Sequence, residues 1–294
     1  IFRNKIHELS TSDLLNHNKL ISFDISFNNF KKIDPQLFDT LLETLAIYDM
    51  NGLHRLPEPR AFRHLRHLRN LYIYNLPLVT SYNISEILRH LPPLRTLAIE
   101  IKEARLSTQL YSADLRLLRN IIITGQQLTK IDTGAFAHLR GYKIDLMVRD
   151  SGITEFPSSI FNTLTSVSFL SLSLINNRIE TLNPFTHTKS PVINQHGTIL
   201  HNIHLTGNPI MCDCRLRWIT SWLQYAEGIH PHTYAPLNDS FCVDQPGGGV
   251  TLYTTYSKPN HLRCTTTGAL ASTANYTPSI FIALYLFIIL LTLR

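Results

Sequence analysis

The residues best suited to chemistry are four cysteines that fall between positions 212 and 264 of a 294-residue chain. One residue separates Cys212 from Cys214, 27 residues lead on to Cys242, and 21 more lead to Cys264. Oxidised thiols would form disulfides that hold loops, whereas four reduced thiolates would make the tetrahedral shell of a zinc site. A Cys-x-Cys pair is tighter than the two-residue spacing usual in zinc sites, so the spacing favours disulfides.

An amphipathic run, CRLRWITSWL, begins at the second of these cysteines and predicts a helix. Trp218 and Trp222 are four residues apart and therefore share one face of such a helix. A helix with two large aromatic side chains on one face, held by neighbouring disulfides, is suited to covering the open end of a hydrophobic core. The residues before it must supply that core.

An internal repeat dominates the chain before the cysteines. The stretch LISFDISFNNF, Leu20 to Phe30, matches the leucine-rich pattern L-x-x-L-x-L-x-x-N-x-L. The same frame returns along the chain, and the first strand residue of each copy lies at position 23, 45, 71, 97, 121, 146, 172 and 203. A period near 25 that holds through all these copies indicates a repeat architecture.

The repeat predicts an α/β solenoid, the leucine-rich-repeat horseshoe. In each copy the L-x-L residues form a short strand with its leucines inward, and the segment after it returns on the outer side. Stacked copies enclose one core, with a parallel β-sheet on the concave face. The Asn of the pattern is expected inside the bend after the strand, where it satisfies backbone groups. That position reads Asn28, Met50, Leu76, Lys102, Gln126, Ser151, Asn177 and Asn208, so the middle copies depart from the pattern.

Four segments follow from this frame. We expect leucine-rich repeats over 1–207, of about 8.5 copies with the first one truncated, and a cysteine-rich cap over 208–264. A polar spacer over 265–279 and a hydrophobic tail over 280–294 follow. Because Asn4 and Ile6 lie 24 residues before Asn28 and Phe30, the chain begins within a copy, and we expect it to be a fragment of a longer protein.

The tail predicts a membrane attachment. The fourteen residues from Ile280 to Leu293, nearly all apolar, would form a helix of about 21 Å, shorter than the roughly 30 Å hydrocarbon layer. Small residues, a polar spacer and a terminal apolar tail are typical of a glycosylphosphatidylinositol signal, with Ser272 as the attachment residue. A short membrane span and a buried core helix are the alternatives.

Two surfaces are candidates for binding. On the concave face, parallel strands would align Tyr48, Tyr72, Tyr74, Asn75 and Arg149 into a protein-binding patch, unless these residues merely cover the sheet. On the outer side, Arg60, Arg63, Arg66 and Arg69 recur every third residue and would hold an acidic glycan or anionic lipid, unless they form an ordinary solvated face.

Charge and composition exclude several classes of function. The formal net charge of +6 favours acidic partners but is weak support for nucleic-acid binding, which we do not expect. The pairs His64 with His67 and His201 with His204 have no acid or cysteine at ligand spacing, and the sequence contains no phosphate loop or nucleophile elbow. We therefore expect a non-enzymatic chain without a cofactor.

Glycosylation motifs favour an oxidising compartment. Asn83, Asn238 and Asn275 each begin an N-x-S/T sequon, and we expect glycans at Asn83 and Asn238. If a lipid anchor replaces the tail, Asn275 is removed together with the tail.

The cysteine segment resembles the carboxy-terminal cap of extracellular leucine-rich-repeat proteins. The resemblance implies first-to-third and second-to-fourth pairing, which is Cys212 to Cys242 and Cys214 to Cys264. The repeats, cap and tail together look like chaoptin- and connectin-type adhesion proteins. That likeness implies homophilic or heterophilic recognition of a protein partner on the extracellular face of the plasma membrane. A transmembrane receptor ectodomain of Toll-like or Slit-binding type is the alternative.

Overall fold

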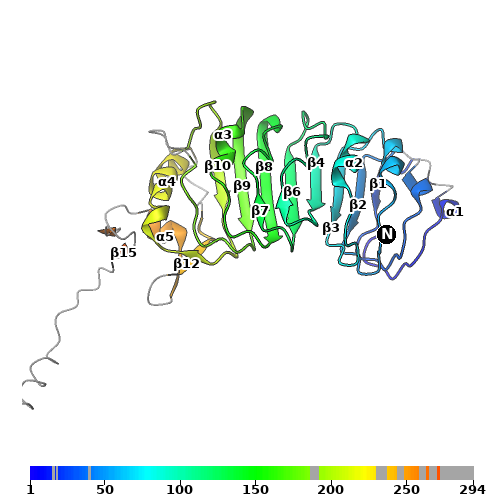
Figure 1. The fold of residues 1–294 in the computed structure, drawn as a ribbon, viewed down its shortest axis with the longest axis horizontal. Coiled ribbons are helices and arrows are strands. Elements are labelled where there is room, and N and C mark those ends of the chain that lie inside the picture. Colours follow the sequence, from blue (N-terminus) through cyan, green and yellow to red (C-terminus); the bar gives the residue numbers. More distant parts are fainter. Residues whose placement is uncertain are drawn as a thin grey trace, which may run out of the picture.

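The computed structural model of the chain describes residues 1–14, 17, 19–38, 41–185, 192–229, 237–243, 248–257, 263–264 and 270–271. Its main element is a parallel sheet of eight strands that runs the length of the molecule (Figure 1). In order across the sheet the strands are β1 (Ser22–Asp24), β2 (Thr44–Tyr48), β3 (Asn70–Tyr74), β4 (Thr96–Glu100), β6 (Asn120–Gly125), β8 (Arg140–Ser151), β9 (Ser166–Ile175) and β10 (Ile199–His204).

Short segments return from each strand and cover the other side of the core. After α1 (Thr11–Leu14), they are η1 (Pro35–Phe38), η2 (Pro59–His64), α2 (Ile84–Arg89), the paired strands β5 (Arg105–Leu106) and β7 (Lys130–Ile131), and α3 (Ile160–Thr163). Each helical segment after α1 buries apolar side chains, and Phe38 of η1 packs 5.2 Å from Phe62 of η2, measured between ring centroids. The core therefore lies between the sheet and these segments, as expected for a leucine-rich-repeat solenoid.

The strand register confirms the repeat frame. Phe23 pairs with Leu45, Leu45 with Leu71, and the series continues through each neighbouring strand to Leu172 and Ile203. All these first strand residues are buried. Because a side chain in a strand faces opposite to its neighbours, the residues between the leucines lie on the other face of the sheet.

The predicted role of the asparagines is confirmed in the outer copies. The Asn177 amide nitrogen donates to the Val148 carbonyl at 3.0 Å, and its oxygen accepts from the Ser151 backbone N–H at 3.2 Å. Asn208 donates to the Leu174 carbonyl at 2.7 Å. Asn28 donates to the Ile1 carbonyl at 2.9 Å and accepts from the Ile6 N–H. Each asparagine ties its own turn to the previous copy.

The middle copies satisfy the same backbone in another way. Met50 and Leu76 fill the position with buried apolar side chains. Beside them, the Glu100 carboxylate accepts from the Leu76 N–H at 3.0 Å, and the Lys102 ammonium donates to the Leu76 carbonyl at 2.7 Å. Glu100 and Lys102 pair with each other at 2.8 Å. An ion pair thus replaces the asparagine that the pattern would place there.

A disulfide-bonded cap follows β10. It contains the small sheet of β11 (Ile210–Met211), β12 (Phe241–Val243) and β13 (Gly249–Thr251), with η3 (Cys214–Leu216), α4 (Trp218–Ile229), α5 (Leu252–Tyr256) and the pair β14 (Arg263–Cys264) and β15 (Leu270–Ala271). Helix α4 lies beyond β10 at the end of the solenoid (Figure 1). The indole of Trp222 is buried and donates to the Leu200 carbonyl at 2.9 Å, and the indole of Trp218 donates to the Leu182 carbonyl. The helix therefore covers the last copy as predicted.

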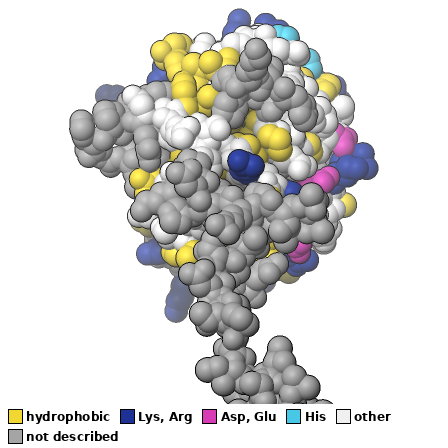
Figure 2. All heavy atoms as spheres, turned by 90° about the vertical axis from the view of Figure 1, so that its left-hand side faces the viewer, with side chains coloured by type: hydrophobic (Ala, Val, Ile, Leu, Met, Phe, Trp, Pro, Cys, Tyr) yellow, Lys and Arg dark blue, Asp and Glu magenta, His cyan; other side chains and the backbone are white. Residues whose placement is uncertain are grey.

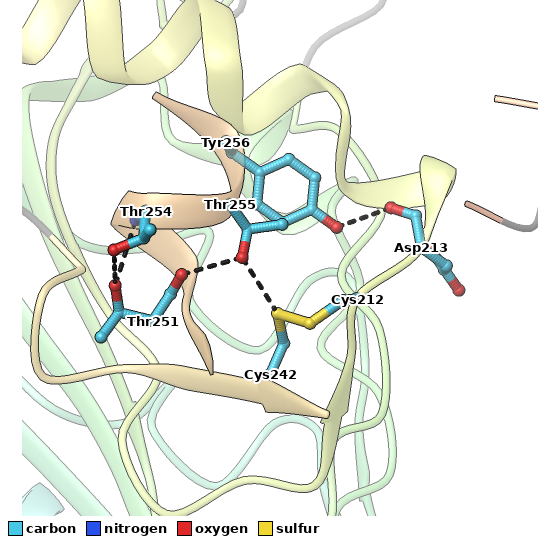
Figure 3. Close-up of a disulfide and its surroundings, with 7 residues drawn as sticks. All are labelled: Cys212, Asp213, Cys242, Thr251, Thr254, Thr255 and Tyr256. Atoms are coloured by element: carbon cyan, nitrogen blue, oxygen red, sulfur yellow. Dashed lines mark hydrogen bonds between the residues drawn. A yellow bond between two sulfur atoms is a disulfide. The ribbon is translucent and has the colours of Figure 1, made fainter. Parts of the chain in front are cut away.

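The structure contains the Cys212–Cys242 disulfide that the cap resemblance implies, with the two Cα atoms 5.1 Å apart (Figure 3). Because these sulfurs are bonded to each other, they cannot serve as two thiolate ligands of a zinc ion. The Tyr256 hydroxyl donates to the Asp213 carbonyl at 2.7 Å and joins α5 to this bridge. Cys214 is also disulfide-bonded. The side chain of its expected partner, Cys264, lies outside the described residues.

The capped end presents mixed side chains. Figure 2 looks onto this end and shows hydrophobic patches between polar groups, with Lys and Arg side chains around the rim. The expected anchor residue Ser272, the sequon at Asn275 and the tail over 280–294 all lie outside the described residues. Within the ranges that the structure describes, no helix combines the length and the apolar character needed to cross a bilayer.

Candidate protein-binding surface on the sheet

A row of aromatic rings crosses the exposed face of the sheet where the strands end. Tyr48 at the end of β2 and Tyr74 at the end of β3 are stacked, with ring centroids 4.6 Å apart and planes at 11°. Phe27 meets Tyr48 edge to face at 5.5 Å. The guanidinium of Arg3 lies 5.2 Å from the Phe27 ring, and that of Arg149 lies 5.2 Å from the Tyr74 ring. We call these five residues the aromatic row.

The contact between Tyr74 and Arg149 spans two other strands, because β4 and β6 lie between β3 and β8. Parallel strands are about 4.8 Å apart, so three spacings place these two backbones about 14 Å from each other. Both side chains must therefore lean over β4 and β6 to meet. They overhang a hollow of about 380 Å³ whose lining includes Glu100, Thr124 and Asp150.

Ala98 of β4 lies two residues before Glu100, which lines the hollow. Ala98 pairs with Tyr72 of β3 and with Ile122 of β6, and all three side chains lie on the exposed face. Ala98 is nevertheless fully buried, because the larger neighbours overhang it. The neighbouring side chains therefore close over β4 at this position, with Tyr72 on the β3 side.

The electrostatics of the row follow from partial burial. Burial raises the pKa of the Tyr74 hydroxyl from 10.0 to about 12, and the nearby Tyr48 adds to the increase. Arg149 opposes this shift because its positive charge favours the phenolate. Arg149 is itself held by Asp150, at 2.6 Å between guanidinium and carboxylate. At neutral pH Tyr74 thus presents a neutral phenol beside a fixed guanidinium.

Backbone turns with positive φ hold the row in place. Phe27, Asp49, Asn75, Asp150 and Asn176 each have φ between 51° and 53°. Three of them directly follow their strands, whereas Phe27 lies three residues after β1 and Asp150 lies near the end of β8. The Asn75 amide donates to the Asp49 carboxylate, and the Asn176 amide donates to the Asp150 carboxylate at 3.1 Å. Asp and Asn accept this conformation readily, whereas an aromatic residue such as Phe27 rarely does. Such strain at an exposed ring is a pointer to function.

The structure brings most of the predicted binding residues together. Tyr48, Tyr74 and Arg149 meet in one row, Asn75 lines the adjoining hollow, and Tyr72 lies on the same face two residues before Tyr74. Sequence reasoning missed Phe27 and Arg3. Phe27 directly precedes Asn28, a position where four of the other seven copies carry Asp or Asn, and that aromatic replacement was the available signal.

The four predicted arginines do not share one site. Arg60 and Arg63 belong to η2 on the side of the returning segments, whereas Arg69 directly precedes β3 at the edge of the sheet. Both sequon asparagines are exposed. Asn83 caps α2 by accepting from the Glu86 N–H at 3.0 Å through its side-chain oxygen. This bond leaves its amide nitrogen, the atom to which a glycan is attached, pointing away from the cap.

Among the residues that the structure describes, no group of three or more His, Cys, Asp or Glu side chains is placed to hold a metal ion.

The sheet in repeat register, the returning segments and the cap define this chain as a leucine-rich-repeat protein by its fold. A chain of the mouse RP105/MD-1 complex shares the fold, with a TM-score of 0.51 at 19% identity over 75% of this chain and 35% of that one. A chain of the Drosophila complex of Toll with Spatzle is 18% identical with a TM-score of 0.45, covering 83% of this chain and 33% of that one.

At the sequence level the chain is similar to chaoptin of Tribolium castaneum, with 27% identity over 169 residues. The match covers 56% of this chain and 21% of chaoptin, so the chain spans about a fifth of the length of this relative. No protein-family model matches the chain.

Proposed function

We propose that this chain is a non-enzymatic recognition module of a cell-surface adhesion protein and that it binds a protein partner through the aromatic row. The observation that carries the proposal is the stacked pair Tyr48 and Tyr74 with the Arg149 guanidinium against it. Tyr and Arg are the residue types that most often supply binding energy at protein interfaces.

The row is already ordered before a partner arrives. Tyr48 and Tyr74 fix each other by stacking, and Arg149 is fixed by Asp150 and by the Tyr74 ring. A partner would therefore immobilise few additional rotamers, which lowers the entropic cost of binding. The hollow lined by Tyr74, Asn75 and Arg149 offers a recess for a partner side chain beside these rings.

The cap supports placement outside the cytosol. The Cys212–Cys242 bridge is buried, and disulfides persist in oxidising compartments such as the extracellular space. The exposed sequons at Asn83 and Asn238 are compatible with the same compartment. The similarity to chaoptin favours adhesion, and the shared fold with a chain of the RP105/MD-1 complex supports binding of a protein partner.

Bead aggregation tests homophilic recognition directly. Beads coated with the chain should aggregate, and Tyr48→Ala with Tyr74→Ala should lower the aggregation rate at least about tenfold, as expected when two central aromatic residues are lost. Tyr111→Ala is the matched control, because Tyr111 is an exposed ring on the returning side that contacts His138. Equal loss in both variants would refute the role of the row.

Heterophilic recognition gives a different result in the same assay. If beads carrying the unaltered chain do not aggregate with each other, they should still bind intact cells, and the double tyrosine variant should abolish that binding. Absence of both self-aggregation and cell binding would overturn the proposed adhesion function.

The anchor separates adhesion from the receptor alternative. We propose lipid attachment at Ser272, which predicts that phosphatidylinositol-specific phospholipase C releases the protein from cells that express it. A transmembrane receptor would stay in the membrane fraction after the same treatment.

A further inference from the structure

A second surface, which is basic, lies at the end of the strands opposite to the aromatic row. Arg69, Arg95 and Arg119 directly precede β3, β4 and β6, and the Asn70, Thr96 and Asn120 that follow them are paired in register. The three arginines therefore follow one another at the strand spacing of about 4.8 Å along the edge of the sheet.

The arginine series borders an open groove of about 620 Å³. Its cationic lining is Arg95, Arg116, Arg119 and Lys143. Arg116 is paired with Asp114 at 2.9 Å and Lys143 lies 3.9 Å from Asp145. By contrast, within the described part of the chain no carboxylate approaches the guanidinium of Arg69, Arg95 or Arg119 within 4.0 Å. Unpaired cations at this spacing form a linear array of positive charge.

The groove also offers an uncharged wall. Tyr142 is 76% exposed, and Leu117 beside it is 46% exposed. The Tyr142 ring is held edge to face against Phe169 at 5.1 Å, so its orientation is fixed although it faces solvent. A flat aromatic ring next to cations suits a sugar ring, whose C–H groups pack on the ring while its acidic substituents meet the guanidiniums.

The backbone at this edge favours a glycan over an acidic peptide. The Arg95 N–H donates to the Arg69 carbonyl at 2.7 Å, the Arg119 N–H to the Arg95 carbonyl at 2.8 Å, and the Asp145 N–H to the Arg119 carbonyl at 2.7 Å. These donors are already used, so an extended peptide would find few backbone partners for strand addition. A ligand recognised by charge and ring stacking has no such requirement.

We propose that this groove binds a sulfated glycosaminoglycan, with Arg95 and Arg119 as its main sulfate contacts. The site is distinct from the aromatic row, so the chain would hold a protein partner at one end of its strands and a glycan at the other.

Binding to immobilised heparin in 0.15 M NaCl tests the proposal. Exchange of two exposed arginines, Arg95→Ser with Arg119→Ser, should weaken the affinity about tenfold, since two exposed ion pairs with sulfate are lost. Tyr142→Ala should weaken it about threefold. The matched control is Arg60→Ser with Arg63→Ser, which removes the same charge from η2 and should change the affinity less than about twofold.

Each other outcome overturns the proposal. Failure of the unaltered chain to bind heparin would refute the site. A larger loss in the Arg60 and Arg63 variant would place the glycan on η2. Equal affinity for polyglutamate or for desulfated heparin would show that sulfate and sugar are not recognised. Bead aggregation by the aromatic row is measured separately, so failure here leaves the proposed adhesion function intact.

Discussion

The outer and middle copies of this solenoid satisfy the same turn with different chemistry. In the outer copies a single neutral amide, such as Asn177, both accepts from and donates to the previous copy. In the middle, Glu100 and Lys102 divide these two tasks between a carboxylate and an ammonium. The amide needs no counter-charge, whereas the ion pair is stable only while both partners are present.

The difference shows that the repeat is defined by its backbone hydrogen bonds more strictly than by its residue pattern. Side chains of Glu100 and Lys102 are only 11% and 12% exposed, so they are charges held within the fold. Asn177 is equally enclosed but neutral. Removal of one charged side chain from the middle copies should therefore lower the free energy of unfolding more than removal of an asparagine side chain from the outer copies.

The largest effect is expected for Glu100→Ala. This change leaves the Lys102 ammonium enclosed without its counter-charge and the Leu76 N–H without an acceptor, which should lower the free energy of unfolding by about 3 to 5 kcal/mol. Urea denaturation measures the loss. The double variant Glu100→Leu with Lys102→Met removes both charges and should recover part of it. A double variant less stable than Glu100→Ala would contradict the interpretation of the pair.

A smaller effect is expected for Asn177→Ala in an outer copy. The Val148 carbonyl and the Ser151 N–H would lose their partners, at a cost of about 2 kcal/mol in the free energy of unfolding. Gln126→Ala is the matched control, because Gln126 holds the same repeat position with an exposed side chain and should change stability by less than about 0.5 kcal/mol. Similar losses of stability in both variants would show that the hydrogen bonds of Asn177 do not stabilise the turn.

The last outer copy allows a comparison between two glycines. Gly207 has φ of 72° and an added Cβ would lie 2.1 Å from the Asn176 side-chain oxygen. Gly197 has φ of 85° with no atom within 4 Å of such a Cβ. Gly207→Ala should lower the free energy of unfolding more than Gly197→Ala does. The Gly197 variant adds only conformational strain of about 1 kcal/mol. Equal melting temperatures would show that the close approach to Asn176 is relieved without cost.

The smallest effect concerns the pH dependence of Tyr74, which lines the same hollow as Glu100. The pKa of Tyr74 is raised from 10.0 to about 12, so folding favours its protonated form. The resulting stabilisation is complete below pH 10 and is lost as pH rises towards 12. Alkaline urea titrations should therefore show the unaltered chain losing stability relative to Tyr74→Phe in this window. If the stabilities of the unaltered chain and of Tyr74→Phe fell in parallel as the pH rose, the raised pKa of Tyr74 would be contradicted.

Much of the fold could be predicted because each copy carries its own pattern. The alternation around Leu45, Leu71 and Leu97 predicted both the strands and their buried side. The cap was predictable because Cys212 and the Trp218 to Trp222 spacing follow directly on the last copy. The ion pair was not predictable, since Lys102 departs from the consensus asparagine and both Glu100 and Lys102 contact Leu76 of another copy.

The candidate site was only partly predictable for the same reason. Tyr48 and Tyr74 share a repeat position, so their proximity follows from the period. Phe27 joins the row through a backbone conformation that is rare for its residue type, and no pattern predicted it.

The sequence by itself determined which residues face the core and which face outward, because strand alternation and the repeat period are local properties of the chain. Only the tertiary structure decided that Arg149 reaches Tyr74 across two strands, since that contact depends on side-chain length and on the order in which the strands are stacked. It also decided that Arg95 and Arg119 lie in line with no carboxylate partner among the described residues, because stacking of copies sets the distance between residues of different turns.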